Sequence, residues 1–167
     1  GWYDYSADRT GRSVAEIAGA KGTRNQDAHR IDWPFSDVEF AGERLLSLGL
    51  TLQQLAARDD VDEIAVFTHV PAFFEQRSPS LPVNDYFLSG DAYFYCPALG
   101  RMLLDAPKVV SLFSGHTHFG HQLTIPRPGR PPLAVAVVDS DGPKGTVRSS
   151  WPRKSTARMS ANPDAWM

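Results

Sequence analysis

Three of the five histidines in this 167-residue chain lie within six consecutive positions, at His116, His118 and His121. Imidazole is the side chain that most often binds metals in proteins. His116 and His118 form a His-x-His pair directly after an apolar run, and glycines on either side allow the backbone to turn tightly there. The spacing predicts a metal site, although hydrolytic chemistry at a metal usually also requires carboxylate ligands.

A fourth histidine, His69, follows a second apolar run over residues 63–68, and Pro71 ends that run. Functional groups in α/β folds gather at the carboxyl ends of buried strands. If the two runs form neighbouring parallel strands, His69, His116 and His118 converge at one edge of the sheet. A single histidine after a strand is more often simply packed or hydrogen-bonded, so the metal interpretation depends on this convergence. We expect His29 to face solvent and His121 to have a structural or supporting role.

The helices and strands predicted around these histidines indicate an α/β fold with a mixed sheet. Ser36 and Glu39 form a capping box, and an apolar stripe with three- and four-residue spacing follows, which predicts a helix over residues 37–58. Pro97 suits the first turn of a second helix over 97–105. Apolar runs predict buried strands over 63–68 and 109–113 and further strands over 120–125, 133–138 and 145–148.

The remaining segments carry no sustained periodicity. Residues 1–35 read mostly as loop, with a short strand near residues 2–5. Residues 72–95 form a long connection rich in aromatic side chains, a length typical of binding loops and lids. Residues 139–143 read as a hairpin-like turn. The composition of residues 149–167 predicts a basic, poorly ordered tail. Such a tail could contact a phosphate-rich partner, but it is more often simply solvated.

Composition excludes several classes of function. The net charge of −2 argues against a nucleic-acid partner. No apolar run is long enough for a membrane span. Cys96 is the only cysteine, which excludes an internal disulfide and a multi-cysteine zinc site. No signal peptide is visible, so we expect a cytoplasmic protein. The chain begins at Gly1 and reads as if it starts within a longer protein.

Two motifs resemble those of calcineurin-like metallophosphoesterases. Residues 112–118 (LFSGHTH) resemble the Gly-His-x-His signature of that family, and residues 66–71 (VFTHVP) resemble its earlier single-histidine motif. The order of the motifs, the apolar strand before each and the helix between them match as well. Residues 1–6 (GWYDYS) resemble the segment after the Asn-His motif of some bacterial members, so the likeness spans residues 1–148.

The resemblance implies a layered α/β/β/α sandwich that holds two divalent metal ions (Mn, Fe or Zn) and hydrolyses phosphoesters, as a phosphatase or a phosphodiesterase. It implies that His69 and His116 bind the second metal and that His118 binds the first. Two adjacent cations would polarise the phosphoryl oxygens and lower the pKa of a bridging water. The substrate is then a phosphorylated compound whose type the sequence does not specify.

The chain also departs from the family pattern, because it contains no Gly-Asp-x-x-Asp and no Gly-Asn-His motif. Ser89-Gly90-Asp91 shares two letters with one of them but follows His69, in the wrong order. The expectation is therefore that residues 1–148 form the C-terminal portion of such a domain, without its N-terminal half. We expect no assignable catalytic residue, weak binding of a single ion and little or no turnover from this chain alone.

Two other interpretations of the histidine motifs are possible alternatives to a metallophosphoesterase. In a non-catalytic metal-binding or protein-interaction module, the histidines would pack or hydrogen-bond and the aromatic connection over 72–95 would bind a partner. A single-metal cupin-type enzyme also uses His-x-His, but it expects a glutamate a few residues later, and residues 119–124 contain none.

Overall fold

The structure, a computed structural model, describes residues 2–117 and 119–139 and forms an α/β fold with a four-stranded mixed sheet. Its helices are α1 (Val14–Arg24), α2 (Asp27–Arg30), α3 (Asp37–Ala56), α4 (Asp85–Gly90) and α5 (Pro97–Asp105), with short 3-10 turns at Phe74–Gln76 and Asp91–Tyr93. Its strands are β1 (Ile64–Phe67), β2 (Val109–Ser114), β3 (His121–Arg127) and β4 (Arg130–Val137).

The strand order across the sheet is β1-β2-β4-β3, and β1, β2 and β4 run parallel. The carboxyl ends of these three strands therefore share one edge of the sheet. Strand β3 pairs antiparallel with β4, and its ladder is irregular between Ile125 and Arg127, on either side of Pro126. Proline has no amide hydrogen to donate, which confines it to edge strands and bulges such as this one.

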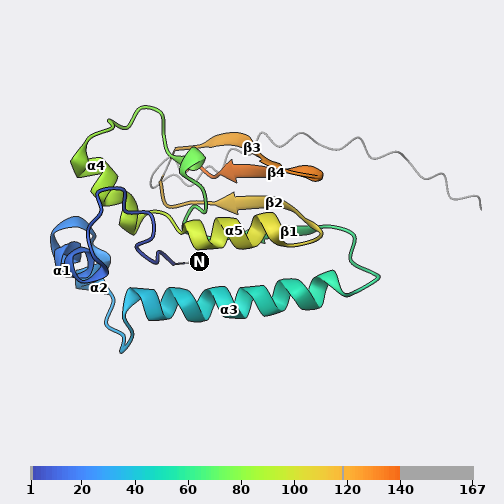
Figure 1. Ribbon diagram of the computed structural model, residues 1–167, viewed down its shortest axis with the longest axis horizontal. Coiled ribbons are helices and arrows are strands. Elements are labelled where there is room, and N and C mark those ends of the chain that lie inside the picture. The colour runs from blue at the N-terminus through green and yellow to red at the C-terminus, as the bar shows by residue number, and fades with distance from the viewer. Residues whose placement is uncertain (1, 118, 140–167) are drawn as a thin grey trace, which may run out of the picture.

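Helices cover one face of the sheet. Helix α5 lies beside β1 and β2, and α3 packs on α5, farther from β3 and β4 (Figure 1). The core between these layers contains Leu52, Leu99, Leu103, Ile64, Val66, Leu112 and Val135. Helices α1, α2 and α4 group at the end of the molecule toward which the arrows of β2 and β4 point (Figure 1). The parallel strands therefore deliver their following loops to a region surrounded by short helices.

The prediction for residues 1–35 was wrong, because they contain α1 and α2 rather than loop, and residues 2–5 form no strand. Ser13 and Glu16 make a capping box at the start of α1 that matches the one at Ser36 and Glu39. Only Ile17 of α1 is buried, so the helix lacks the long apolar stripe that made α3 recognisable. Tertiary contacts add support, since the Tyr93 hydroxyl donates to the Ile17 carbonyl at 2.7 Å.

The prediction of a buried strand over residues 63–68 holds for only one face of β1. Ile64 and Val66 face the helices, whereas Ala65 is exposed and the Phe67 side chain is 74% exposed. Phe67 stacks on Phe113 of β2, with ring centroids 4.7 Å apart. Strand β1 is an edge strand in this sheet, so its outer side chains have one neighbouring strand and no covering layer among the described residues.

The other predicted elements agree with the structure to within a few residues. Helices α3 and α5 and strands β1 to β4 correspond to the six predicted over 37–58, 97–105, 63–68, 109–113, 120–125 and 133–138. The connection over 72–95 is present but contains α4 and two 3-10 turns. The predicted strand over 145–148, most of the turn over 139–143 and the tail over 149–167 lie outside the described residues.

Helix α5 packs closely on the loop that follows β1, and this contact requires a glycine. A Cβ atom at Gly100 would lie 2.5 Å from the Ala72 carbonyl oxygen and 2.9 Å from the Phe73 ring. The Cys96 amide also donates to the Pro71 carbonyl at 2.9 Å, so the start of α5 is bonded directly to the same loop.

We predict that Gly100→Ala lowers the free energy of unfolding by about 1 to 3 kcal/mol, because backbone and ring must move apart to admit the methyl group. Gly42→Ala is the matched control, since that glycine lies in α3 with open space around it. It should raise the free energy of unfolding by roughly 0.5 to 1 kcal/mol. Urea unfolding measures both, and equal effects of the two substitutions would contradict the close contact.

The stability of the protein should fall in mild alkali because of Cys96. Burial, with a smaller contribution from the Asp4 charge, raises the pKa of this thiol to about 11. An unfolded cysteine ionises near pH 8.5, so the unfolded state releases a proton in a range where the folded state keeps it. The free energy of unfolding should decrease by roughly 1 kcal/mol between about pH 8.5 and 9.5. Cys96→Ala should remove that slope in urea titrations, and an unchanged slope would contradict a buried neutral thiol.

Candidate metal and substrate site

The parallel pairing of β1 and β2 brings His69 and His116 together. Phe67 lies opposite Phe113 in the register, and each strand continues directly into its histidine loop. Two backbone hydrogen bonds extend the pairing past the strands, from the Thr68 amide to the Phe113 carbonyl at 2.9 Å and from the Gly115 amide to the His69 carbonyl at 3.1 Å. The two loops therefore leave the sheet side by side.

The two imidazole rings are in direct contact. The Nδ1 atom of His116 lies 2.9 Å from the Nε2 atom of His69, and the ring planes meet at 79°. One of the two nitrogens must therefore carry the hydrogen that the other accepts. His116 also has a φ of +67°, in the left-handed region that residues other than glycine rarely adopt. Such backbone strain occurs most often at functional sites, where the surrounding structure maintains it.

A buried glutamine fastens the two loops to each other. Gln76 is fully buried, and its Oε1 atom accepts hydrogen bonds from the Ala72 and Phe73 amides at 2.8 and 3.0 Å. Its Nε2 atom donates to the Ser114 hydroxyl at 2.6 Å, just before the Gly115-His116 turn. One side chain thus bonds the loop after His69 to the end of β2.

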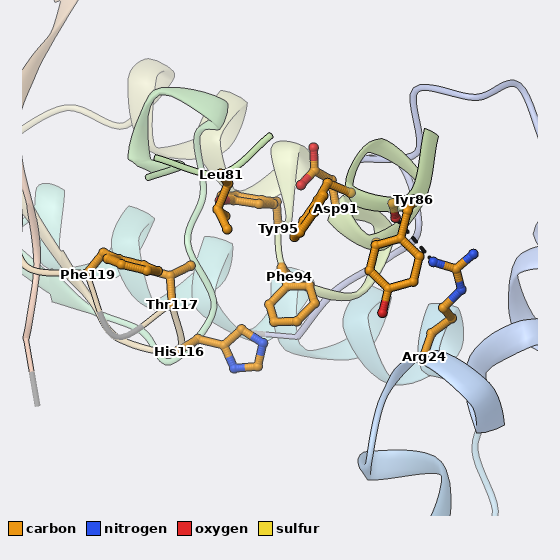
Figure 2. Close-up of a pocket in the computed structure, with 11 residues that line it drawn as sticks. Arg24, Leu81, Tyr86, Asp91, Phe94, Tyr95, His116, Thr117 and Phe119 are labelled. Atoms are coloured by element: carbon orange, nitrogen blue, oxygen red, sulfur yellow. Dashed lines mark hydrogen bonds between the residues drawn. The ribbon is translucent and has the colours of Figure 1, made fainter. Parts of the chain in front are cut away.

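A pocket of about 360 Å³ opens beside His116. Figure 2 shows the ring of Phe94 between His116 and Tyr86, with Leu81 and Phe119 along the other side. The Phe94 and His116 rings touch, with centroids 4.8 Å apart. Ligand sites in proteins have this size and a predominantly apolar lining with a few polar groups. The pocket therefore borders the histidine pair, because His116 belongs to both.

The charged side chains among the described residues of the pocket lining are Asp91 and Arg24. Asp91 is buried, but its carboxylate pairs with Arg9 at 2.5 Å and lies 3.5 Å from Arg77. Arg24 lies over the Tyr86 ring at 4.3 Å and donates to the Tyr86 carbonyl at 3.2 Å. Arg24 forms no ion pair with a carboxylate in the part of the chain that the structure describes. The pocket should therefore attract anions.

The structure brings two of the three predicted metal ligands together, His69 and His116, while His118 lies outside the described residues. His121 begins β3, and its ring nitrogens lie 3.1 Å from the Phe119 carbonyl and 3.4 Å from the Glu75 carbonyl. His29 is exposed, as predicted, and its Nε2 atom donates to the Gly22 carbonyl at 2.7 Å.

Three residues of this region were not identified from the sequence: Gln76, Arg24 and Phe94. Nothing in the sequence distinguishes Gln76 from any other loop glutamine, because its role depends on contacts 38 positions away. Arg24 is an ordinary basic residue in the last turn of a helix that was not predicted. The aromatic richness of residues 72–95 was the one available signal, and it did not specify which rings face the histidines.

The histidine pair fits part of a metal site. Two imidazole nitrogens that bind one ion at about 2.1 Å lie about 3.0 Å apart at a right angle and about 3.4 Å apart at the tetrahedral angle of zinc sites, so the 2.9 Å observed here is closer to the right-angle geometry. Across residues 2–117 and 119–139 no group of three or more His, Cys, Asp or Glu side chains is arranged to hold an ion. His69 and His116 would therefore supply two donors, and the remaining ligands must come from other residues.

Comparison with known proteins leaves the family unassigned. No protein-family model matches the sequence, and no curated protein matches it. Among the described residues, no helix is long and apolar enough to cross a membrane.

We predict that Gln76→Leu lowers the free energy of unfolding by about 2 to 4 kcal/mol, because it leaves two buried amides and a buried hydroxyl without a partner. Gln54→Leu, on the exposed side of α3, is the matched control and should change stability by less than about 0.5 kcal/mol. Thermal and urea unfolding measure both. A neutral Gln76→Leu variant would show that the hydrogen bonds between the loops contribute nothing.

Proposed function

We propose that this chain is part of a metal-dependent phosphoester hydrolase, with residues 1–148 as the C-terminal portion of a calcineurin-like metallophosphoesterase domain. The observation that carries the proposal is the contact between His69 and His116. These two of the three histidines in the family-like motifs are 47 positions apart, and their ring nitrogens lie 2.9 Å apart at one sheet edge. Neither motif alone predicts that contact.

The proposed roles follow from the donors. His69 and His116 would bind one divalent ion, Mn, Fe or Zn, and His118 would bind a second. A metal pair of this kind supplies a nucleophilic water and stabilises negative charge on the phosphoryl oxygens. The chain's own contribution is to hold the two rings at a fixed separation through the paired loops, which the buried side chain of Gln76 connects. An ion would replace the hydrogen that the rings now share.

The exposed face of the sheet supports the sandwich architecture proposed for the complete domain. On the face opposite α5, strands β1 and β2 present Ala65 and the stacked rings of Phe67 and Phe113, and β4 adds Ala134 and Ala136. The polar residues of this face are Ser111 on β2 and Gln122 and Thr124 on the edge strand β3. A second sheet could pack on its apolar part. The missing carboxylate ligands would come from the half of the domain that contains that second sheet.

We predict that the chain binds Mn²⁺ weakly and that His69→Ala and His116→Ala each reduce the affinity at least 10-fold, because each removes a direct ligand. His29→Ala is the matched control, since this exposed histidine lies in α2, away from the pair, and its ring donates to the Gly22 carbonyl. It should leave the affinity unchanged. Calorimetric titration measures all four proteins, and inorganic phosphate should then bind more tightly with Mn²⁺ present than without it.

Unchanged Mn²⁺ binding in both His69→Ala and His116→Ala would contradict the proposal and favour the non-catalytic module. Efficient hydrolysis of an activated aryl phosphate by the isolated chain would contradict a different part of it, namely that carboxylates from elsewhere complete the site.

A further inference from the structure

We propose that the pocket beside His116 binds an aromatic ring, so that the preferred substrate is a phosphoester whose organic group is aromatic. This inference rests on the proposed function for the position of the phosphoryl group. The affinity for an aromatic ring does not depend on the proposed function, because it comes from the side chains that line the pocket.

The shape and size of the pocket suit a flat ring. Its volume is about 360 Å³, whereas about 150 Å³ is enough to hold a benzene molecule. The remaining space leaves room for the ester oxygen and for part of a larger ring system. A short alkyl group would leave most of the pocket filled with water and would gain little.

The lining offers aromatic surfaces rather than only aliphatic ones. Phe94 lies between His116 and Tyr86, and the Tyr86 side chain is 62% exposed although it lines the pocket (Figure 2). An exposed aromatic side chain beside a cavity provides a surface on which a ligand ring can stack. Aromatic pairs are worth a factor of about 3 to 10 in affinity beyond the burial of their apolar area.

The polar groups of the pocket suit an anionic ester. The positive charge of Arg24 lies beside Tyr86, at the end away from His116, while the carboxylate of Asp91 is already paired with arginines. The Thr117 hydroxyl is buried and has no hydrogen-bond partner among the described residues. Thr117 lines the pocket next to His116, so it can donate to an ester or phosphoryl oxygen held there. With the phosphoryl group beside His116 and Thr117, the ring of the ester would lie toward Phe94 and Tyr86.

The test compares ligands of equal charge that differ in the ring. Phenyl phosphate, cyclohexyl phosphate and methyl phosphate are titrated by calorimetry into the full chain, without metal and with Mn²⁺. Phenyl phosphate should bind at least about 5-fold more tightly than methyl phosphate and more tightly than cyclohexyl phosphate. Amide resonances of Phe94 and Tyr86 should shift in NMR spectra on addition of phenyl phosphate.

Two substitutions remove the rings and keep apolar bulk. Tyr86→Leu alters a largely exposed side chain, and Phe94→Leu alters a partly buried one. Each should reduce the ratio of phenyl to methyl phosphate affinity about 3-fold or more. Phe35→Leu is the matched control, because Phe35 is a partly exposed aromatic residue that does not line this pocket. Circular dichroism confirms that each variant is folded.

Equal binding of phenyl and methyl phosphate would overturn the inference, as would a preference for the ring that survives both substitutions. The titrations without metal and with Mn²⁺ distinguish a failure of this inference from a failure of the proposed function. A ring preference that is present without metal, together with affinities of all three phosphates that Mn²⁺ leaves unchanged, would support the aromatic pocket and contradict the metal site.

Discussion

The parallel pairing of β1 and β2 is the constraint on which the rest of the site depends. Parallel neighbours end at the same edge of a sheet, so the loops that follow them must start side by side. Here the backbone bonds continue beyond the strands to the Gly115 amide and the His69 carbonyl. That continuation fixes the ring of His69 against the ring of His116. An antiparallel arrangement of the same two strands would place the histidines at opposite edges.

The interactions around this edge depend on one another. The loop after β1 accepts helix α5 because residue 100 is glycine, and it is fastened to β2 through Gln76. Helix α5 in turn follows directly from the segment that provides Phe94 to the pocket. Burying the polar atoms of Gln76 is favourable only because each has a partner. The same packing that stabilises the core therefore holds the histidine pair and shapes the pocket beside it.

Much of the fold could be predicted from the sequence because its main elements carry strong local signals. The capping box at Ser36 and the leucine stripe after it determine α3, and Pro97 marks the start of α5. Helix α1 was missed because its single buried residue gives no periodic stripe and Gly19 and Gly22 weaken it. The exposed face of β1 was missed because an apolar run does not reveal how many layers cover it.

The candidate site was predictable only in part for a related physical reason. Motif spacing indicated that His69 and His116 should converge, since both follow apolar strands. The residues that position and surround them, such as Gln76 and Arg24, act through contacts between segments distant in the sequence. Their side chains have no local pattern that differs from ordinary surface residues. Sequence reasoning therefore predicted that the two histidines converge, but it identified neither Gln76 nor the pocket.

The most direct test of the central claim is ¹⁵N NMR of the histidine rings during a titration with Zn²⁺. If His69 and His116 share one ion, the Nε2 resonance of His69 and the Nδ1 resonance of His116 should shift together, at the same Zn²⁺ concentration, while the ring of His29 does not respond. Before metal is added, ring protons of His69 and His116 should show a mutual nuclear Overhauser effect. Shifts at clearly different Zn²⁺ concentrations, or no contact between the two rings, would contradict the account.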